Sequence, residues 1–297
     1  MLARLLRKIL AIQAIFLALL SATTVWALGV PAWAGVLIFA LVPLLLVGAW
    51  TLKITRHACQ EQPIWPDIGR ASLGEAWWVY RAFITRMPWS WRAPQLQPAL
   101  GPSGGIGVVL VHGFVCNHRV WDDLAPRLRA RGHAVFAVDL EPVFASIDDY
   151  AAAIEQAVQR LCAHTGHQQV ALIGHSMGGL AIRAWMRAHG TSRAALAITL
   201  GTPHQGTQVS PHARAPNGKQ MVWHSAWLQA LGAGETAQTR ALFRIAITPQ
   251  DAIVFPQRAQ VLPGVLPQVF DGLGHVELCS NAKVMDWVAA ELVAVQP

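Results

Sequence analysis

The chain has 297 residues, of which 54% are hydrophobic and only 13% are charged, and its formal net charge at pH 7 is +7. Disorder over most of the length is excluded, because disordered chains are polar and rich in charge. A basic chain can bind nucleic acid, but the sequence has no zinc-finger spacing, no aromatic RNA-binding signature and no long Lys/Arg run, so we expect no nucleic-acid partner.

An uncharged run extends from residue 9 to residue 52. A membrane-spanning helix needs about 20 apolar residues, and the run holds two such segments, 9–28 and 33–52, on either side of a turn-like link. Tryptophans near the ends of both segments favour the membrane–water interface. We therefore predict a membrane anchor with two transmembrane helices over residues 1–56.

The first of these segments also fits a cleaved signal peptide, since residues 4–8 supply a basic leader and residues 25–27 resemble a cleavage site. The apolar run continues well beyond that site, which favours two spans. Basic residues flank the pair on both sides, with Lys53 and Arg56 after the second span. The positive-inside rule then places everything downstream on the cytoplasmic side of a membrane, which we expect to be a bacterial inner membrane.

Residues 57–103 form a connector rich in tryptophan, arginine and proline. Aromatic and basic side chains together favour the headgroup layer of a membrane. The alternative is that the same tryptophans pack onto the globular part, and the sequence leaves both interpretations open. The tryptophans and arginines are Trp65, Trp77, Trp78, Trp89, Trp91, Arg70, Arg81, Arg86 and Arg92.

From residue 104 onward, short apolar runs alternate with amphipathic stretches. Such runs are typical of buried parallel strands, and their alternation with helices indicates an α/β fold with helices on both faces of a mostly parallel sheet. The pattern holds six candidate strands, so we expect a six-stranded sheet in a domain spanning 104–297. We predict strands at 106–111, 134–139, 169–173, 195–200, 243–248 and 266–270, and helices at about 119–131, 147–164, 178–190 and 281–294.

The sharpest motif is Gly174-His175-Ser176-Met177-Gly178, which follows a predicted strand and precedes a predicted helix. This is the context of a nucleophile elbow, in which a strained turn exposes the serine hydroxyl at the carboxyl end of the sheet. The flanking glycines are needed because side chains there would collide with the tight backbone. Ser176 is therefore the candidate nucleophile.

A serine hydroxyl is a weak nucleophile until a base takes its proton. On this kind of elbow the acid and then the base follow the serine in the chain. His275 is the candidate base, because it lies in a Gly-rich loop after the last predicted strand. Asp251, after the strand at 243–248, is the candidate acid that orients the imidazole. Asp271 is the alternative acid, although it lies in the same loop as His275.

An oxyanion intermediate needs two backbone N–H donors. One is expected from Met177, the residue after the nucleophile, and the other from the loop that follows the first predicted strand. In that loop Gly113 permits a close backbone approach, and the N–H of Phe114 is the candidate donor.

These segments together resemble the α/β-hydrolase superfamily, and within it the bacterial lipases and esterases. The matching segments are His112-Gly113-Phe114, the elbow at 174–179, and residues 200–206, which look like a loop of triacylglycerol-lipase-like proteins. The resemblance covers about residues 104–295. It implies that Ser176 attacks an ester carbonyl, that His275 transfers the proton and that water releases the acid, with no cofactor and no metal. It does not identify the substrate-binding residues.

Residues 203–240 contain no clear strand and are long for a connection. Because they carry apolar side chains such as Trp223 and Trp227, we expect a mobile lid that binds an acyl chain. The alternative is an ordered excursion without a gating role.

The sequence thus predicts a membrane-anchored serine hydrolase, a lipase or esterase that acts on an apolar acyl ester beside membrane lipids. A thioesterase or acyltransferase with the same triad is the alternative, and a non-catalytic accessory protein with a hydrolase fold is a third possibility. The physiological ester, its acyl-chain length and the oligomeric state do not follow from the sequence.

Overall fold

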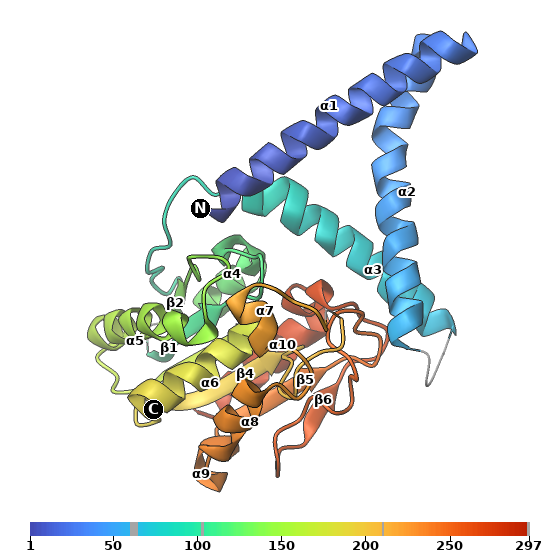
Figure 1. Ribbon diagram of the computed structural model, residues 1–297. Coiled ribbons are helices and arrows are strands. Elements are labelled where there is room, and N and C mark those ends of the chain that lie inside the picture. Colours follow the sequence, from blue (N-terminus) through green and yellow to red (C-terminus); the bar gives the residue numbers. More distant parts are fainter. Residues whose placement is uncertain (60–64, 102–103, 210, 296–297) are drawn as a thin grey trace.

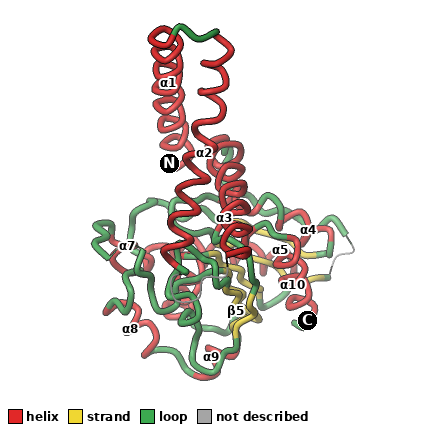
Figure 2. The backbone as a smooth tube through the Cα atoms, turned by 90° about the vertical axis from the view of Figure 1, so that its right-hand side faces the viewer, coloured by secondary structure: helices red, strands yellow, loops and turns green. Residues whose placement is uncertain are grey.

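Two long helices project from the rest of the molecule. The computed structural model describes residues 1–59, 65–101, 104–209 and 211–295, so parts of the predicted connector (60–64 and 102–103) and residue 210 of the predicted lid lie outside the described residues. Helices α1 (Leu2–Leu28) and α2 (Ala32–Ala58) meet at Gly29, whose φ of 61° reverses the chain. Figures 1 and 2 show this turn far from the sheet. By length and composition both helices can cross a membrane.

The connector contains a helix that the sequence did not indicate. Helix α3 (Trp65–Tyr80) continues into a π-helical turn (Arg81–Arg86) and a 3₁₀ turn (Met87–Trp89). In Figure 1 it runs between the start of α1 and the end of α2, alongside the sheet domain. Trp77, Trp89 and Trp91 are exposed. Trp77 stacks on Tyr80, Trp89 lies against Trp91, and the guanidinium of Arg7 in α1 lies over the ring of Trp91.

The sheet has six strands, all paired in parallel, in the order β2-β1-β3-β4-β5-β6. Each observed strand overlaps one predicted strand, so the predicted sheet is confirmed. In the centre, Leu110 of β1 lies beside Ala137 of β2 and Ile173 of β3. The strands are β1 (Gly105–Val111), β2 (His133–Ala137), β3 (Val170–His175), β4 (Ala194–Leu200), β5 (Phe243–Ile247) and β6 (Pro267–Val269).

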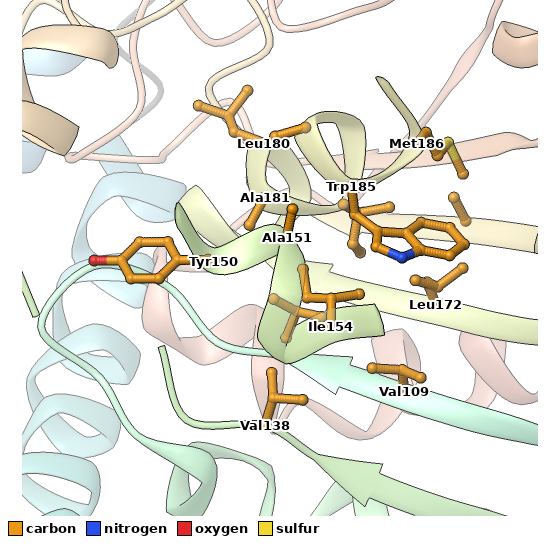
Figure 3. Packing of buried hydrophobic residues seen from close by; sticks show 14 of the residues in the cluster. Val109, Val138, Tyr150, Ala151, Ile154, Leu172, Leu180, Ala181, Trp185 and Met186 are labelled. Carbon is orange, nitrogen blue, oxygen red and sulfur yellow. The ribbon is translucent and has the colours of Figure 1, made fainter. Parts of the chain in front are cut away.

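Helices cover both faces of the sheet, as the alternating pattern predicts (Figure 1). Helices α5 (Ala151–Thr165) and α6 (Met177–His189) cover one face, and α4 (Leu124–Ala130) and α10 (Ala282–Val293) cover the other. Figure 3 shows the first interface, where Trp185 of α6 and Ile154 of α5 meet Leu172 of β3. All three side chains are fully buried. This core fixes the sheet edge on which the elbow lies.

The segment between β4 and β5 contains three short helices, α7 (Pro216–Gln220), α8 (Ala226–Ala233) and α9 (Ala237–Ala241). Buried Asn217 donates to the carbonyl of Val143 over 2.8 Å. Arg183 of α6 pairs with Glu235 over 2.6 Å, and both side chains are buried. These bonds tie the segment to the domain in the described conformation.

The outer side of β2 is occupied by the connector. The N–H of Gln97 donates to the carbonyl of Val135, and the N–H of Val135 donates to the carbonyl of Gln97, each over 2.8 Å. This antiparallel bridge lies beside the edge strand and fixes the end of the connector to the sheet.

Candidate active site

Ser176 lies in a strained turn between β3 and α6. Its φ of 54° and ψ of −127° are rare for a residue with a side chain. The N–H of Ser176 donates to the carbonyl of Leu200 over 2.9 Å, and Thr202 Oγ1 donates to the carbonyl of Ser176 over 2.9 Å. Both bonds come from the end of β4 and hold the turn in this conformation.

Close backbone approaches explain the glycines around the elbow. A Cβ atom at Gly174 would lie 2.6 Å from the backbone nitrogen of Gly179. At Gly113, in the loop after β1, a Cβ atom would lie 2.8 Å from the Cβ atom of Ser176. Both separations are shorter than real side chains adopt, so residues other than glycine would push the loop and the elbow apart.

Asp251 and His275 are in direct contact. Asp251 follows β5, His275 follows β6, and the Nδ1 atom of His275 donates to Asp251 Oδ2 over 2.7 Å. The other carboxylate oxygen, Oδ1, accepts the N–H groups of Ile253 and Val254 over 2.8 and 2.7 Å. Because β3, β5 and β6 are parallel, Ser176, Asp251 and His275 all lie at the carboxyl edge of the sheet.

The alternative acid takes no part in this contact, because Asp271 is exposed to solvent. Gly201, at the end of β4, stands against the Asp251–His275 pair, and a Cβ atom there would lie 3.2 Å from both Asp251 Oδ2 and His275 Nδ1. The pair is nearly closed off from water, with 2% of Asp251 and 4% of His275 exposed.

The candidate oxyanion donors lie on either side of the elbow. Met177 is the first residue of α6, and Phe114 follows Gly113 after β1. Among the described residues, neither backbone N–H has an acceptor. The loop is held by His112, whose Nδ1 donates to the Gly113 carbonyl over 2.8 Å and whose Nε2 accepts the N–H of Leu140 over 2.9 Å.

His175 supports the base directly, a role that the sequence did not reveal. Its ring lies against that of His275, with centroids 4.6 Å apart, and its Nε2 donates to the backbone carbonyl of His275 over 3.0 Å. Burial, together with the charge that His275 carries when protonated, lowers the pKa of His175 well below its ordinary value. His175 is therefore uncharged, and it fixes the backbone of His275 through this hydrogen bond.

A second carboxylate, Glu75 of α3, reaches the same loop and was also missed. Its Oε2 atom accepts the N–H of Val276 over 2.8 Å and the N–H of Glu277 over 3.3 Å. Burial raises the pKa of Glu75 to about 7, and the charge of His275 and these two hydrogen bonds oppose the rise.

The pKa of His275 reflects both carboxylates. Burial alone would lower it, but the charge of Asp251, the hydrogen bond to Asp251 and the charge of Glu75 outweigh burial and raise the pKa of His275 above 6.5. Within the described ranges, no group of three or more His, Cys, Asp or Glu side chains is arranged to hold a metal ion.

Comparisons with known proteins agree with this fold. A family model for the alpha/beta hydrolase fold matches residues 107–240. A triacylglycerol lipase of Pseudarthrobacter phenanthrenivorans is 34% identical over 110 residues, which cover 34% of this chain and 34% of the lipase. Methylesterase 3 of Arabidopsis thaliana is 37% identical over 82 residues, covering 25% of this chain and 31% of the esterase. The match thus spans about a third of these relatives.

Solved structures share the architecture at low sequence identity. The mature lipase BlEst2 of Bacillus licheniformis superposes with a TM-score of 0.57 at 15% identity, covering 66% of this chain and 96% of the lipase. Lipase B of Aspergillus fumigatus gives a TM-score of 0.59 at 17% identity, covering 69% of this chain and 57% of the lipase. The sheet domain therefore has the α/β-hydrolase fold that its sequence resembles, and it is similar to lipases and esterases.

Proposed function

We propose that this chain, whose sheet domain has the α/β-hydrolase fold, is a membrane-anchored serine hydrolase that cleaves carboxylic esters. The observation that carries the proposal is the 2.7 Å contact between His275 Nδ1 and Asp251 Oδ2, at the sheet edge where Ser176 adopts its strained turn. A neutral His275 held in this way presents Nε2 as a proton acceptor.

In the proposed reaction His275 Nε2 takes the proton of the Ser176 hydroxyl while the oxygen attacks the ester carbonyl. The N–H groups of Phe114 and Met177 stabilise the negative charge of the tetrahedral intermediate. His275 then gives its proton to the departing alcohol, which leaves an acyl group on Ser176. A water molecule, deprotonated by His275, releases the carboxylic acid and restores the serine.

The surroundings of the nucleophile support an apolar acyl group. Phe114 and Phe144 stack edge to face with their ring centroids 5.8 Å apart, and 37% and 44% of them remain exposed. An exposed aromatic pair next to the oxyanion loop offers apolar contact surface to a substrate. The names of the relatives, a triacylglycerol lipase and a methylesterase, fit the same ester chemistry.

In this proposal the membrane anchor places the active site beside lipid. Helices α1 and α2 span a bacterial inner membrane, with the catalytic domain on the cytoplasmic side, and membrane lipids or esters dissolved in them supply the substrate. The segment 203–240 acts as a lid over the acyl chain only if the bonds from Asn217 and Arg183 break, because these bonds hold it in the described conformation.

Replacement of the nucleophile tests the proposal. In Ser176→Ala we expect hydrolysis of p-nitrophenyl butyrate to fall by about a thousandfold or more, and covalent labelling by a fluorophosphonate to disappear. Ser192→Ala is the matched control, because Ser192 is exposed before β4, at the opposite edge of the sheet. Retention of hydrolysis in Ser176→Ala would refute the serine mechanism.

Product analysis separates the ester hydrolase from the alternatives with the same triad. With a long-chain alcohol added, a hydrolase releases mainly the free acid, whereas an acyltransferase yields a new ester. Faster turnover of an acyl thioester than of the matched oxygen ester would identify a thioesterase.

A further inference from the structure

We propose that Glu75 of α3 is a positioning residue for His275, so that the membrane-proximal arm, which consists of helices α1, α2 and α3, completes the active site of the sheet domain. This inference rests on the proposed function, since it assigns a role toward the general base of that reaction. Glu75 lies far before His275 in the sequence. It reaches the loop that contains His275, here called the histidine loop, only because α3 packs against η5 (Val276–Cys279).

The carboxylate of Glu75 fastens the loop immediately after the base. Its Oε2 atom accepts two successive backbone N–H groups, those of Val276 and Glu277, over 2.8 and 3.3 Å. Only 3% of Glu75 is exposed, so water cannot replace it as the acceptor. Gly274 permits the approach, because a Cβ atom there would overlap the Glu75 carboxylate.

The contact is reciprocal. The carboxylate of Glu277 lies over Gly74 of α3, where a Cβ atom would overlap it. Glu277 is held in place by its own bonds, since Oε2 accepts the N–H of Gly274 over 3.2 Å and Oε1 accepts the side-chain amide of Asn281 over 2.9 Å. Helix α3 and the histidine loop therefore interlock through two carboxylates and two glycines.

His275 is thereby held at its backbone from two directions. His175, in the nucleophile elbow, binds the carbonyl of His275, and Glu75, in α3, binds the N–H of the next residue. Catalysis by an imidazole depends on its placement within a fraction of an ångström, and small misplacements reduce rates strongly. Glu75, which supplies the second of these contacts, lies outside the segment 104–295 that resembles the hydrolases.

Glu75 also acts on His275 through its charge. The titratable groups around Glu75 are His275 and Asp251 at the site, Glu277 on η5, and the buried thiols of Cys116 and Cys279. Burial raises the pKa of both thiols, so they stay neutral near pH 8. An ionised Glu75 stabilises the imidazolium that forms when His275 takes the serine proton.

The test is the pH profile of Glu75→Gln in the full chain in detergent. The amide keeps the size and an acceptor oxygen but removes the charge. We expect kcat to fall about tenfold with little change in KM, and the acid limb of kcat/KM to move to lower pH, because the imidazolium of His275 loses a stabilising charge. Rates are normalised to the fraction of Ser176 labelled by a fluorophosphonate.

Glu75→Asp separates charge from placement. The shorter side chain keeps the charge but withdraws from Val276, so kcat should fall while the acid limb stays near its original pH. If Glu75→Gln does not fold, the kcat of Glu75→Asp still tests the positioning role. Glu155→Gln is the control for loss of a buried carboxylate, because Glu155 lies on α5 and binds Trp185 and Arg193 away from the site.

The outcomes distinguish the two proposals. If Ser176→Ala is inactive but both Glu75 variants keep the original kcat and acid limb, the positioning role is wrong and the serine hydrolase stands. If Ser176→Ala remains active, the proposed function itself fails. A fall in kcat that Glu155→Gln reproduces would show a general loss of structure and would overturn the role of Glu75.

Discussion

Two carboxylates from distant parts of the chain act on His275, and their environments differ. Asp251 is bound to the imidazole itself and to two backbone N–H groups of its own loop. Glu75 is bound to backbone N–H groups beside the imidazole, in a buried position that raises its pKa to about 7. Glu75 therefore carries its charge near pH 8 at a cost in stability, as functional groups often do.

This cost predicts a pH-dependent difference in stability. The pKa of Glu75 is raised from 4.5 in the unfolded chain to about 7 in the folded one, so between these values the folded state binds more protons and stability falls as the pH rises. Relative to Glu75→Gln, the wild type should lose up to about 3 kcal/mol between pH 4.5 and pH 8. Thermal unfolding of both proteins across this range measures the difference, and parallel curves would contradict it.

The spacing around Ser176 predicted the strained turn that the structure contains, because an elbow is local and its glycines are adjacent in sequence. Asp251 could be chosen over Asp271 because it follows a separate predicted strand, whereas Asp271 lies in the same loop as His275, and Asp251 is the one that contacts His275. Glu75 and His175 could not be assigned in this way. Their contacts join residues far apart in the chain, and no spacing rule connects them.

At the scale of elements, the strands were predictable and α3 was not. Buried parallel strands are continuous apolar runs, as in β1. Helix α3 buries the face formed by Ile68, Ala71, Ser72 and Glu75. The spacing is helical, but two of the four buried residues are polar, so the face does not stand out by hydrophobicity.

The interlock of α3 predicts opposite effects for two glycines of that helix. Gly74→Ala places a methyl group against the Glu277 carboxylate and should cost about 1–3 kcal/mol of stability and reduce activity. Gly69→Ala, with nothing within 4 Å of its Cβ position, should stabilise the helix by up to about 1 kcal/mol and leave activity unchanged. Thermal unfolding and ester hydrolysis measure both, and equal effects at the two positions would argue against the interlock.

At the scale of the whole molecule, the arm and the catalytic domain are one structural unit. The first residues of α1 and the last residues of α2 both lie near the sheet domain, while the turn at Gly29 points away (Figures 1 and 2). Leu2 and Leu6 are buried beside Met87, Cys116 and Val143, close to the oxyanion loop. Movement of the arm would therefore disturb the site.

The proposed topology predicts opposite signals from reporters at the two ends of α2. Alkaline phosphatase, which is active only in the periplasm, should be inactive when fused after Arg56 and active when fused at Gly29, because one helix separates these points. A reporter active only in the cytoplasm should give the reverse pattern. Phosphatase activity after Arg56 would place the catalytic domain outside the inner membrane.

The bridge between Gln97 and Val135 has a consequence for association between copies of the chain. An edge strand with unpaired N–H and C=O groups is a template for intermolecular sheet extension. On β2 both backbone groups of Val135 are already engaged by Gln97. At the far edge, β6 has three residues and begins with Pro267, which lacks an N–H donor. At both margins of the sheet, part of the backbone that could pair with a neighbouring strand is thus already engaged or lacks a donor, and this limits sheet extension between copies of the chain.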